Sequence, residues 1–426
     1  MRESQKLPSI ELPSIELPSL AGAPWLAEHR VQRVFALLSA AGGEARVAGG
    51  AVRNALMGQP VGEVDFATTL TPDAVTAAAG KSGIKAVPTG IEHGTVTLVV
   101  EGIAYEVTTL RQDIATDGRH AVVRFGHDWT ADAERRDFTM NALSVDAAGT
   151  VYDPVGGYPD LVARRVRFIG DADTRIAEDR LRILRFFRFH AVYGNGTPDP
   201  EALSAAVRAR NGLRELSAER IGQEMRRIVV APRAVEAAVL MQEVGILPVV
   251  LGGIGWLAGF AAAVAFQAAA GAAPAVPVRL AALACRVVED AARLSARLRL
   301  ANVERERILA ALAAAPLFVP LPGERRAREL LYRLGETGYR DGLIHARARD
   351  TTSDLAPWLE FYRLPDRWTA PSFPLGGSDV IGAGVARGPI VGETLRAVEA
   401  WWIAGDFAAD EAALRRRLQQ ILAAQQ

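Results

Sequence analysis

Two carboxylates one residue apart, Glu63 and Asp65, lie in the segment GEVDFATT. The segment is typical of a short strand, whose side chains alternate between two faces, so both carboxylates would point the same way. Two acids on one face repel each other unless a cation lies between them, and Mg²⁺ prefers carboxylate oxygens together with substrate phosphates. Glu106, in the segment YEVTTLR, would add a third acid on one face with Thr108. The plain alternative is an acidic strand end that faces water.

A pair of glycines stands shortly before these acids. Gly49 and Gly50 open the segment AGGAVRNALMG, in which a helix is expected to end at Gly58. Backbone N–H groups at a helix N-terminus can approach a phosphate, and the helix dipole favours the anion. Arg53, one turn into the helix, could reach the same phosphates. Glycines followed by paired acids predict a nucleotidyltransferase site, with phosphates on one side and metals on the other.

Further segments follow in an order that resembles the motifs of the class II (bacterial-type) tRNA nucleotidyltransferase and poly(A) polymerase superfamily. They cover about residues 49–229 and are VAGGAVRNALMGQPVGEVDFATT, VPTGIEHGTVTLVV…YEVTTLR, DGRHAVVRF, RRDFTMNAL, YDPVGGYPDL, AEDRLRILRFFRF and SAERIGQEMRRIV. The resemblance implies two Mg²⁺ ions at Glu63 and Asp65, with Glu106 as a further catalytic carboxylate. It also implies CTP and ATP as substrates.

The segment RRDFTMNAL offers polar side chains for ribose hydroxyls and triphosphate, namely Arg135, Arg136, Asp137 and Asn141. The resemblance implies that Arg136 and Asp137 help to select ribose, whereas a salt bridge at a helix start is the alternative. Phe138, Met140 and Leu143 are expected to pack inward.

The segment AEDRLRILRFFRF has a strongly helical pattern, on which Glu178 and Asp179 precede Arg182 by four and three residues. A surface ion pair is the plain reading of such spacing. An Asp acceptor beside an Arg donor fork can also pair with the Watson–Crick edge of a base. The resemblance implies that Asp179 and Arg182 read cytosine or adenine, and Glu178 and Arg185 complete the expected base-recognition set. Neighbouring arginines favour an RNA end as partner: Arg164, Arg165, Arg167, Arg175, Arg180 and Arg188.

The implied reaction is addition of C and A to the tRNA 3′ end. The RNA 3′-hydroxyl attacks the α-phosphate of CTP or ATP, and pyrophosphate leaves. The stretch TGIEHGTVTL resembles the CCA-adding branch, whereas poly(A) polymerases carry a basic segment there. A poly(A) polymerase and an A-only or CC-only enzyme remain alternatives. A catalytically inactive RNA-binding relative is a further one, because Glu63 and Asn54 stand where most members have Asp.

The order of patterns predicts an α+β fold, in which an N-terminal mixed β-sheet domain with helices is followed by an all-α remainder. Expected strands include RVAGG and EVDFA, a hairpin turns at Glu101 and Gly102, and a helix follows the N-cap Thr71. The expected parts are a low-complexity arm (1–22), a head (23–150), a neck (151–235), a body (236–335) and a tail (336–426). A glycine-rich loop and helix at 373–402 are expected to contact tRNA.

Composition narrows the class of protein. The chain of 426 residues has 49 basic and 49 acidic side chains, so a nucleic-acid surface must be local, and no DNA partner is expected. A single cysteine, Cys285, suits a reducing cytoplasm. Residues 244–278 carry no charge, but proline, glycine and Gln267 interrupt them, which favours buried helices over a membrane span. After His190 the chain has only His345, so no metal-dependent phosphohydrolase activity is expected.

Overall fold

The computed structural model describes residues 16–91, 94–116 and 121–424, which form two compact units. The first unit comprises Met1–Glu224, Ala231–Arg233 and Val244–Val249, and the remainder forms the second. Most of the predicted low-complexity arm and parts of the GIEHGT and DGRHAVVRF segments lie outside the described residues. Near the arm's end, the Leu20 N–H donates to the Gly149 carbonyl (2.8 Å).

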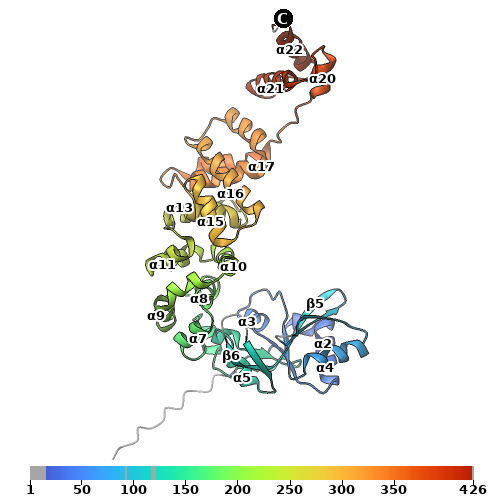
Figure 1. The fold of residues 1–426 in the computed structure, drawn as a ribbon, viewed down its shortest axis with the longest axis vertical. Helices are drawn as coiled ribbons and strands as arrows, with labels where there is room; N and C mark the ends of the chain where they lie inside the picture. The colour runs from blue at the N-terminus through green and yellow to red at the C-terminus, as the bar shows by residue number, and fades with distance from the viewer. Residues whose placement is uncertain (1–15, 92–93, 117–120, 425–426) are drawn as a thin grey trace, which may run out of the picture. The chain divides into compact units, whose positions relative to one another are not determined.

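A seven-stranded mixed sheet forms the base of the first unit (Figure 1). Strand β2 pairs in parallel with β5, and every other pairing in this sheet is antiparallel. This arrangement confirms the predicted mixed sheet. In spatial order the strands are β3 (Lys85–Gly90), β4 (Thr95–Val100), β5 (Ile103–Thr109), β2 (Phe66–Thr68), β1 (Ala45–Ala48), β8 (Ser144–Val145) and β9 (Val151–Tyr152). A separate pair consists of β6 (Arg111–Thr116) and β7 (Ala121–Phe125).

The predicted hairpin is confirmed. Glu101 and Gly102 separate β4 from β5 with φ angles of 50° and 81°, as a two-residue hairpin turn with two positive φ angles requires. The predicted strand at EVDFA starts later than expected, because regular pairing begins only at Phe66. Glu63 and Asp65 therefore lie in the segment before β2, although the Asp65 carbonyl still accepts from the Ala48 N–H (3.0 Å).

Short helices accompany the sheet of the first unit. They are α1 (Pro24–Ala27), α2 (His29–Ala40), α3 (Gly50–Leu56), α4 (Pro72–Lys81), α5 (Trp129–Glu134) and α6 (Tyr158–Val162). Helix α4 begins as predicted, with the Thr71 hydroxyl accepting from the Ala74 N–H (3.4 Å). Phe66 of β2 is buried edge-to-face against Phe35 of α2, at 4.9 Å between ring centroids. This contact packs α2 onto the strand that follows the two acids.

Four helices follow in the same unit. They are α7 (Ala172–Glu178), α8 (Arg182–Tyr193), α9 (Pro200–Ala209) and α10 (Ala218–Val229), whose last residues belong to the second unit. The prediction of one continuous helix over AEDRLRILRFFRF is wrong. Asp179 is extended (φ −152°, ψ 108°), which ends α7 and separates it from α8. The sequence hides this break, because buried apolar residues continue at helical spacing from Ile176 of α7 to Ile183 and Phe187 of α8.

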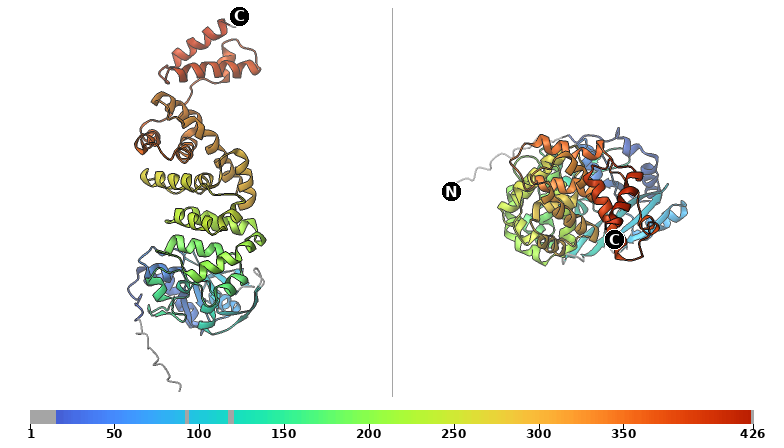
Figure 2. Two further views of the ribbon diagram at one scale, coloured as in Figure 1. Left: turned by 90° about the vertical axis from the view of Figure 1, so that its left-hand side faces the viewer. Right: turned by 90° about the horizontal axis from the view of Figure 1, so that it is seen from above.

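The second unit is helical (Figure 2). Its helices are α11 (Ala234–Glu243), α12 (Ile246–Leu251, shared with the first unit), α13 (Leu257–Ala269), α14 (Val276–Ala284), α15 (Val288–Leu298), α16 (Asn302–Ala314), α17 (Glu324–Arg347), α18 (Leu355–Tyr362), α19 (Leu364–Arg367), α20 (Gly377–Gly382), α21 (Pro389–Ala404) and α22 (Glu411–Ala423). One core gathers Phe266, Phe318, Tyr339 and Trp358, and another gathers Val380, Val398, Trp402 and Leu414.

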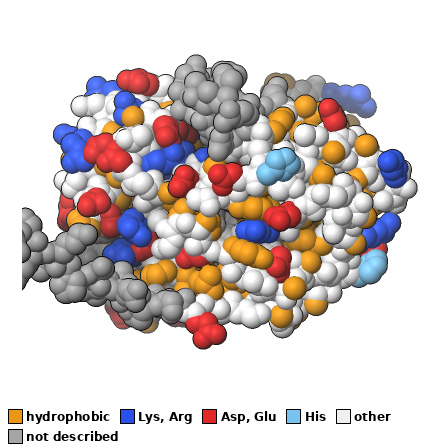
Figure 3. Space-filling model, turned by 90° about the horizontal axis from the view of Figure 1, so that it is seen from below, with side chains coloured by type: hydrophobic (Ala, Val, Ile, Leu, Met, Phe, Trp, Pro, Cys, Tyr) orange, Lys and Arg blue, Asp and Glu red, His pale blue; other side chains and the backbone are white. Residues whose placement is uncertain are grey.

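The uncharged stretch 244–278 supplies α12, α13 and the first turn of α14, as expected for buried helices. Phe260 and Phe266 of α13 are both fully buried. Within the described residues, every helix is too short or too polar to cross a bilayer. Cys285 is buried and unpaired, and burial raises the pKa of its thiol to about 12. On the face drawn in Figure 3, acidic and basic side chains are interspersed, in keeping with a net charge of zero.

Candidate active site

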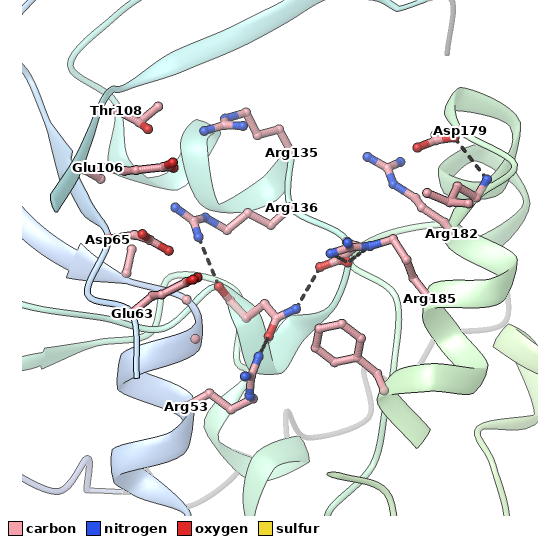
Figure 4. Close-up of a pocket in the computed structure, with 18 of the residues that line it drawn as sticks. Arg53, Glu63, Asp65, Glu106, Thr108, Arg135, Arg136, Asp179, Arg182 and Arg185 are labelled. Atoms are coloured by element: carbon pink, nitrogen blue, oxygen red, sulfur yellow. Dashed lines mark hydrogen bonds and ion pairs between the residues drawn. The ribbon is translucent and has the colours of Figure 1, made fainter. Parts of the chain in front are cut away.

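An open pocket of about 700 Å³ in the first unit collects side chains from β5, α3, α8, α10 and the segments around them (Figure 4). All of the residues predicted for the site except Glu178 line it. They are Gly49, Gly50, Arg53, Glu63, Asp65, Glu106, Arg135, Arg136, Asp137, Asn141, Asp179, Arg182 and Arg185. Segments separated by more than a hundred residues therefore meet in one place.

Three carboxylates form one wall of the pocket. Glu63, Asp65 and Glu106 point into the same space in Figure 4, next to Thr108. The walls of the pocket desolvate Asp65 and raise the pKa of its carboxyl, and the like charges of Glu106 and Glu63 raise it further, while Arg136 opposes the shift. The wall therefore carries repulsion that a cation would relieve.

The donor set of this wall fits magnesium bound together with a substrate. Within the described parts of the chain, His, Cys, Asp and Glu side chains form no ready-made cluster of three for a metal ion. Mg²⁺ does not need one, since it usually takes one or two protein carboxylates and completes its shell with water and phosphate oxygens. Hard carboxylate oxygens suit that ion, and none of the described residues that line the pocket offers a thiol or an imidazole.

Arg136 lies between the acidic wall and the glycine turn. Gly49 has a φ angle of +78°, and a Cβ atom there would come within 3.1 Å of Arg136 Nη1. Glycine is thus required both by backbone conformation and by space. Arg135 and Arg136 are both held by buried Asp132, with N–O distances of 2.6 and 3.2 Å. Asp132 thereby holds both guanidinium groups, which extend toward the acidic wall in Figure 4.

Arg53 is buried at the floor of the pocket, with 6% of its surface exposed. Its guanidinium donates to the side-chain oxygens of Asn54 (2.9 and 3.2 Å), Asn141 (2.5 Å) and Tyr193 (2.7 Å). Burial lowers the pKa of this guanidinium, and the phenol of Tyr193 and the carboxylate of Asp137 oppose the shift. A phosphate-binding role for Arg53 stays a prediction, because most of its described donors face protein oxygens.

Asp137 and Asn141 connect this floor to helix α8. Asn141 Nδ2 donates to Asp137 Oδ1 (2.9 Å), while Arg185 donates to Asp137 Oδ2. Burial alone would raise the pKa of Asp137, but Arg185, the Asn141 amide and the Phe138 N–H together hold it below its ordinary value. The carboxylate is therefore ionised and fixed. Phe138, Met140 and Leu143 are fully buried, as predicted.

The residues predicted to recognise the base lie around the break between α7 and α8. Asp179 Oδ2 accepts from Arg220 Nη2 (2.7 Å), and Asp179 Oδ1 accepts from the Leu181 N–H (3.0 Å). Arg182, which also lines the pocket, donates to Glu178. Glu178 does not line the pocket, and its carboxylate instead holds Arg175 and Arg182. The Asp179 carboxylate and the Arg182 guanidinium thus face the same space, and each is held by hydrogen bonds to its neighbours.

Sequence reasoning missed four residues of this arrangement. Arg220, Asp132, Tyr193 and Phe189 either line the pocket or hold a side chain that does. Arg220 lies in the segment SAERIGQEMRRIV, so a signal for it was present. Asp132 precedes Arg135 and Arg136 by three and four residues, which an ordinary surface ion pair would also show. No spacing rule points to Tyr193, because its contact with Arg53 is set by the packing of separate helices.

Comparisons with known proteins point to one family. Residues 45–167 match the family model of the poly(A) polymerase head domain. Mitochondrial CCA tRNA nucleotidyltransferase 1 of Homo sapiens is 34% identical over 376 residues, which span 84% of this chain and 82% of the human one. The CCA-adding enzyme of Geobacillus thermodenitrificans is 41% identical over 207 residues, 48% of this chain and 50% of that sequence.

Solved structures extend the similarity over nearly the whole chain. The crystal structure of the Bacillus stearothermophilus CCA-adding enzyme in complex with CTP superposes with a TM-score of 0.76 at 28% identity. The match covers 93% of this chain and 98% of that one. Both described units are therefore included in the match.

Proposed function

The chain belongs to the family of CCA-adding tRNA nucleotidyltransferases, and from this we propose that it adds C and A to the 3′ end of tRNA. Its substrates are CTP, ATP and a tRNA that lacks all or part of its 3′-terminal CCA. The observation that carries the proposal is a single pocket with carboxylates on one wall and an Asp–Arg pair on the other. Phosphoryl chemistry and base choice can therefore take place in one site.

Each part of the pocket has a role in the transfer. Arg135 and Arg136, held by Asp132, bind the triphosphate beside the glycine turn and stabilise the charge that develops on the leaving pyrophosphate. Asp137 and Asn141 contact the ribose. Asp179 and Arg182 present an acceptor and a donor fork to the Watson–Crick edge of the base. The attacking 3′-hydroxyl of the RNA enters from the open side of the pocket.

We propose that Glu63 and Asp65 hold two Mg²⁺ ions, with Glu106 as a third carboxylate beside them. Bound there, the metal ions would lower the pKa of the attacking hydroxyl and neutralise the leaving oxygens. The raised pKa of Asp65 supports this proposal, because burial and then the like charges of Glu106 and Glu63 disfavour its ionised form in the absence of a cation. Glu63 is one methylene longer than Asp, and its position in a segment without regular pairing gives it room to adjust.

The remaining assignments follow the same family. We propose that residues 151–235 form a neck, 236–335 a body and 336–426 a tail that contacts tRNA, the last through α20 and α21. We also propose a cytoplasmic location, where a single buried thiol such as Cys285 stays reduced. The mitochondrial location of the human relative makes cell fractionation the appropriate test of this point.

A tRNA transcript without its last three nucleotides distinguishes the alternatives. Incubated with the protein, Mg²⁺, CTP and ATP, it is expected to gain CCA, as read by sequencing of its 3′ end. A run of A would identify a poly(A) polymerase, and addition that stops at CC or requires a CC end would identify a partial enzyme. No addition under any of these conditions would leave the inactive RNA-binding relative.

A further inference from the structure

A tyrosine outside the pocket lining holds the buried arginine at its floor. Tyr193 is the last residue of α8, and its hydroxyl accepts from Arg53 Nη2 at 2.7 Å. The Arg53 guanidinium also lies over the Tyr193 ring, 4.0 Å from its centroid. Arg53 comes from α3, next to the glycine turn. This contact therefore joins the phosphate side of the pocket to the C-terminal end of α8.

The same guanidinium continues into a chain of hydrogen bonds toward the base side. Arg53 donates to Asn141, Asn141 donates to Asp137, and Arg185 donates to Asp137. Arg185 lies on α8, two turns before Tyr193. This chain of hydrogen bonds, which we call the relay, has Arg185 at one end and Tyr193 at the other. Helix α8 is therefore held at two points.

Arg53 depends on each of its acceptors, because it is buried and its hydrogen-bond partners are neutral. Asn54, Asn141 and Tyr193 supply oxygen atoms but no full negative charge. A buried cationic donor that loses an acceptor keeps its desolvation cost without compensation. Arg53 would then shift, and Asn141 would lose the partner that orients its amide toward Asp137.

We propose that Tyr193 is a positioning residue for nucleotide selection, acting through Arg53, Asn141 and Asp137 on Arg185 and the helix that begins with Arg182. The proposal rests on the proposed function, since it concerns the choice of base in the same site. Tyr193 itself does not line the pocket. A correct base is bound more tightly in the transition state when the side chains that contact it are held in place, whereas a wrong base makes few of these contacts. Weakening the relay therefore lowers kcat/KM for CTP and ATP more than kcat/KM for UTP.

The test compares Tyr193→Phe with Tyr152→Phe. Tyr152 does not line the pocket, and it too has a hydrogen-bonded hydroxyl and an arginine over its ring. Its hydroxyl donates to Asp146 (3.0 Å), whereas that of Tyr193 accepts, and Arg46 lies 3.6 Å from its ring centroid. For each protein, kcat/KM for CTP, ATP and UTP is measured on truncated tRNA together with the melting temperature. Tyr193→Phe is expected to lower kcat/KM for CTP and ATP by about tenfold, to leave UTP nearly unchanged, and to keep its melting temperature near that of Tyr152→Phe.

Two results would overturn the proposal. In the first, the ratio of kcat/KM for CTP to kcat/KM for UTP is the same in Tyr193→Phe as in wild type, or Tyr152→Phe changes this ratio as much as Tyr193→Phe does. In the second, all three nucleotides lose activity equally, as expected for a role in folding alone. An inactive wild-type protein would instead refute the proposed function, so the two failures are distinguishable.

Discussion

Arg185 donates two hydrogen bonds to the same carboxylate oxygen of Asp137, from Nε at 2.7 Å and from Nη2 at 2.5 Å. The two residues are 48 positions apart and belong to different segments of the pocket. Asp137 is buried, whereas Arg185 is partly open to the pocket. This pair fixes helix α8 against the segment that follows α5, and thereby fixes the position of the residues that we propose to read the base.

Removing the charge of Asp137 is expected to destabilise the protein. Asp137→Asn leaves Arg185, which is partly open to the pocket, without this counter-charge. Losing a hydrogen bond between charged groups costs about 2 kcal/mol in the free energy of unfolding. Chemical denaturation measures this loss. Asp173→Asn is the matched control, because Asp173 and Arg208 form a similar two-bond pair that is more than half exposed. The control is expected to leave the free energy of unfolding nearly unchanged, because solvent screens an exposed pair, and equal losses in the two variants would contradict this prediction.

Neutralising Asp65 is expected to stabilise the metal-free protein while it abolishes activity. Because the folded-state pKa of Asp65 is raised, its ionisation weakens the fold as the pH rises above the usual range of an aspartate. Asp65→Asn removes that penalty. Its melting temperature without Mg²⁺ should exceed that of wild type by about 1–2 °C at about pH 8 and match it near about pH 4.

Added Mg²⁺ should reverse this order. An ion that binds only the folded state stabilises it by mass action, so wild type is expected to gain stability with increasing Mg²⁺ and Asp65→Asn to gain less. Melting temperatures measured at increasing Mg²⁺ concentrations, in buffer free of Ca²⁺, check this. Equal stabilisation of both proteins would show that Asp65 is not a ligand.

Glu63 is expected to work as a carboxylate of adjustable reach. Glu63→Ala should lower kcat by about 100-fold, because a metal ligand is lost. Glu63→Asp keeps the charge and should retain activity within about tenfold of wild type, with a higher Mg²⁺ concentration at half-maximal rate. If Glu63→Ala stayed fully active, Glu63 would not be a metal ligand but only an acidic side chain that faces water.

Asp179 and Arg220 are expected to act together on the choice of base. Asp179→Ala removes the acceptor, and Arg220→Ala releases it from the hydrogen bond that holds it. Both variants should lower the preference for CTP and ATP over UTP and GTP by at least about tenfold, as measured by single-nucleotide incorporation. Asp173→Ala, on the exposed side of α7, is the control. An unchanged preference in Asp179→Ala would refute base reading by this residue.

The sequence predicted the site better than it predicted the local backbone. Gly49, Gly50, Glu63, Asp65 and Glu106 all reach one pocket, because glycine and carboxylate chemistry restrict what such segments can do. The hydrophobic patterns, in contrast, misplaced the start of β2 and missed the break between α7 and α8. Three residues of pairing in β2 are too few to fix its start, and the helical spacing after residue 177 does not reveal the extended conformation of Asp179.

The contacts that hold the functional side chains could not be predicted. Asp132 is buried under Arg135 and Arg136 at ordinary helical spacing, which a surface ion pair would also show. Tyr193 and Arg53 lie 140 residues apart, and their contact arises only when α8 packs beside α3. Such partners depend on tertiary packing, because the residue types alone allow many other pairs that are equally plausible.

Transfer of AMP to a tRNA that ends in CC shows whether the pocket carries out nucleotidyl transfer. Wild type and Asp65→Ala are compared side by side, with Mg²⁺ and ATP labelled at the α-phosphate. Wild type is expected to add one A to each tRNA and to release pyrophosphate, while Asp65→Ala remains at background. An inert wild type, or an Asp65→Ala variant as active as wild type, would contradict this expectation.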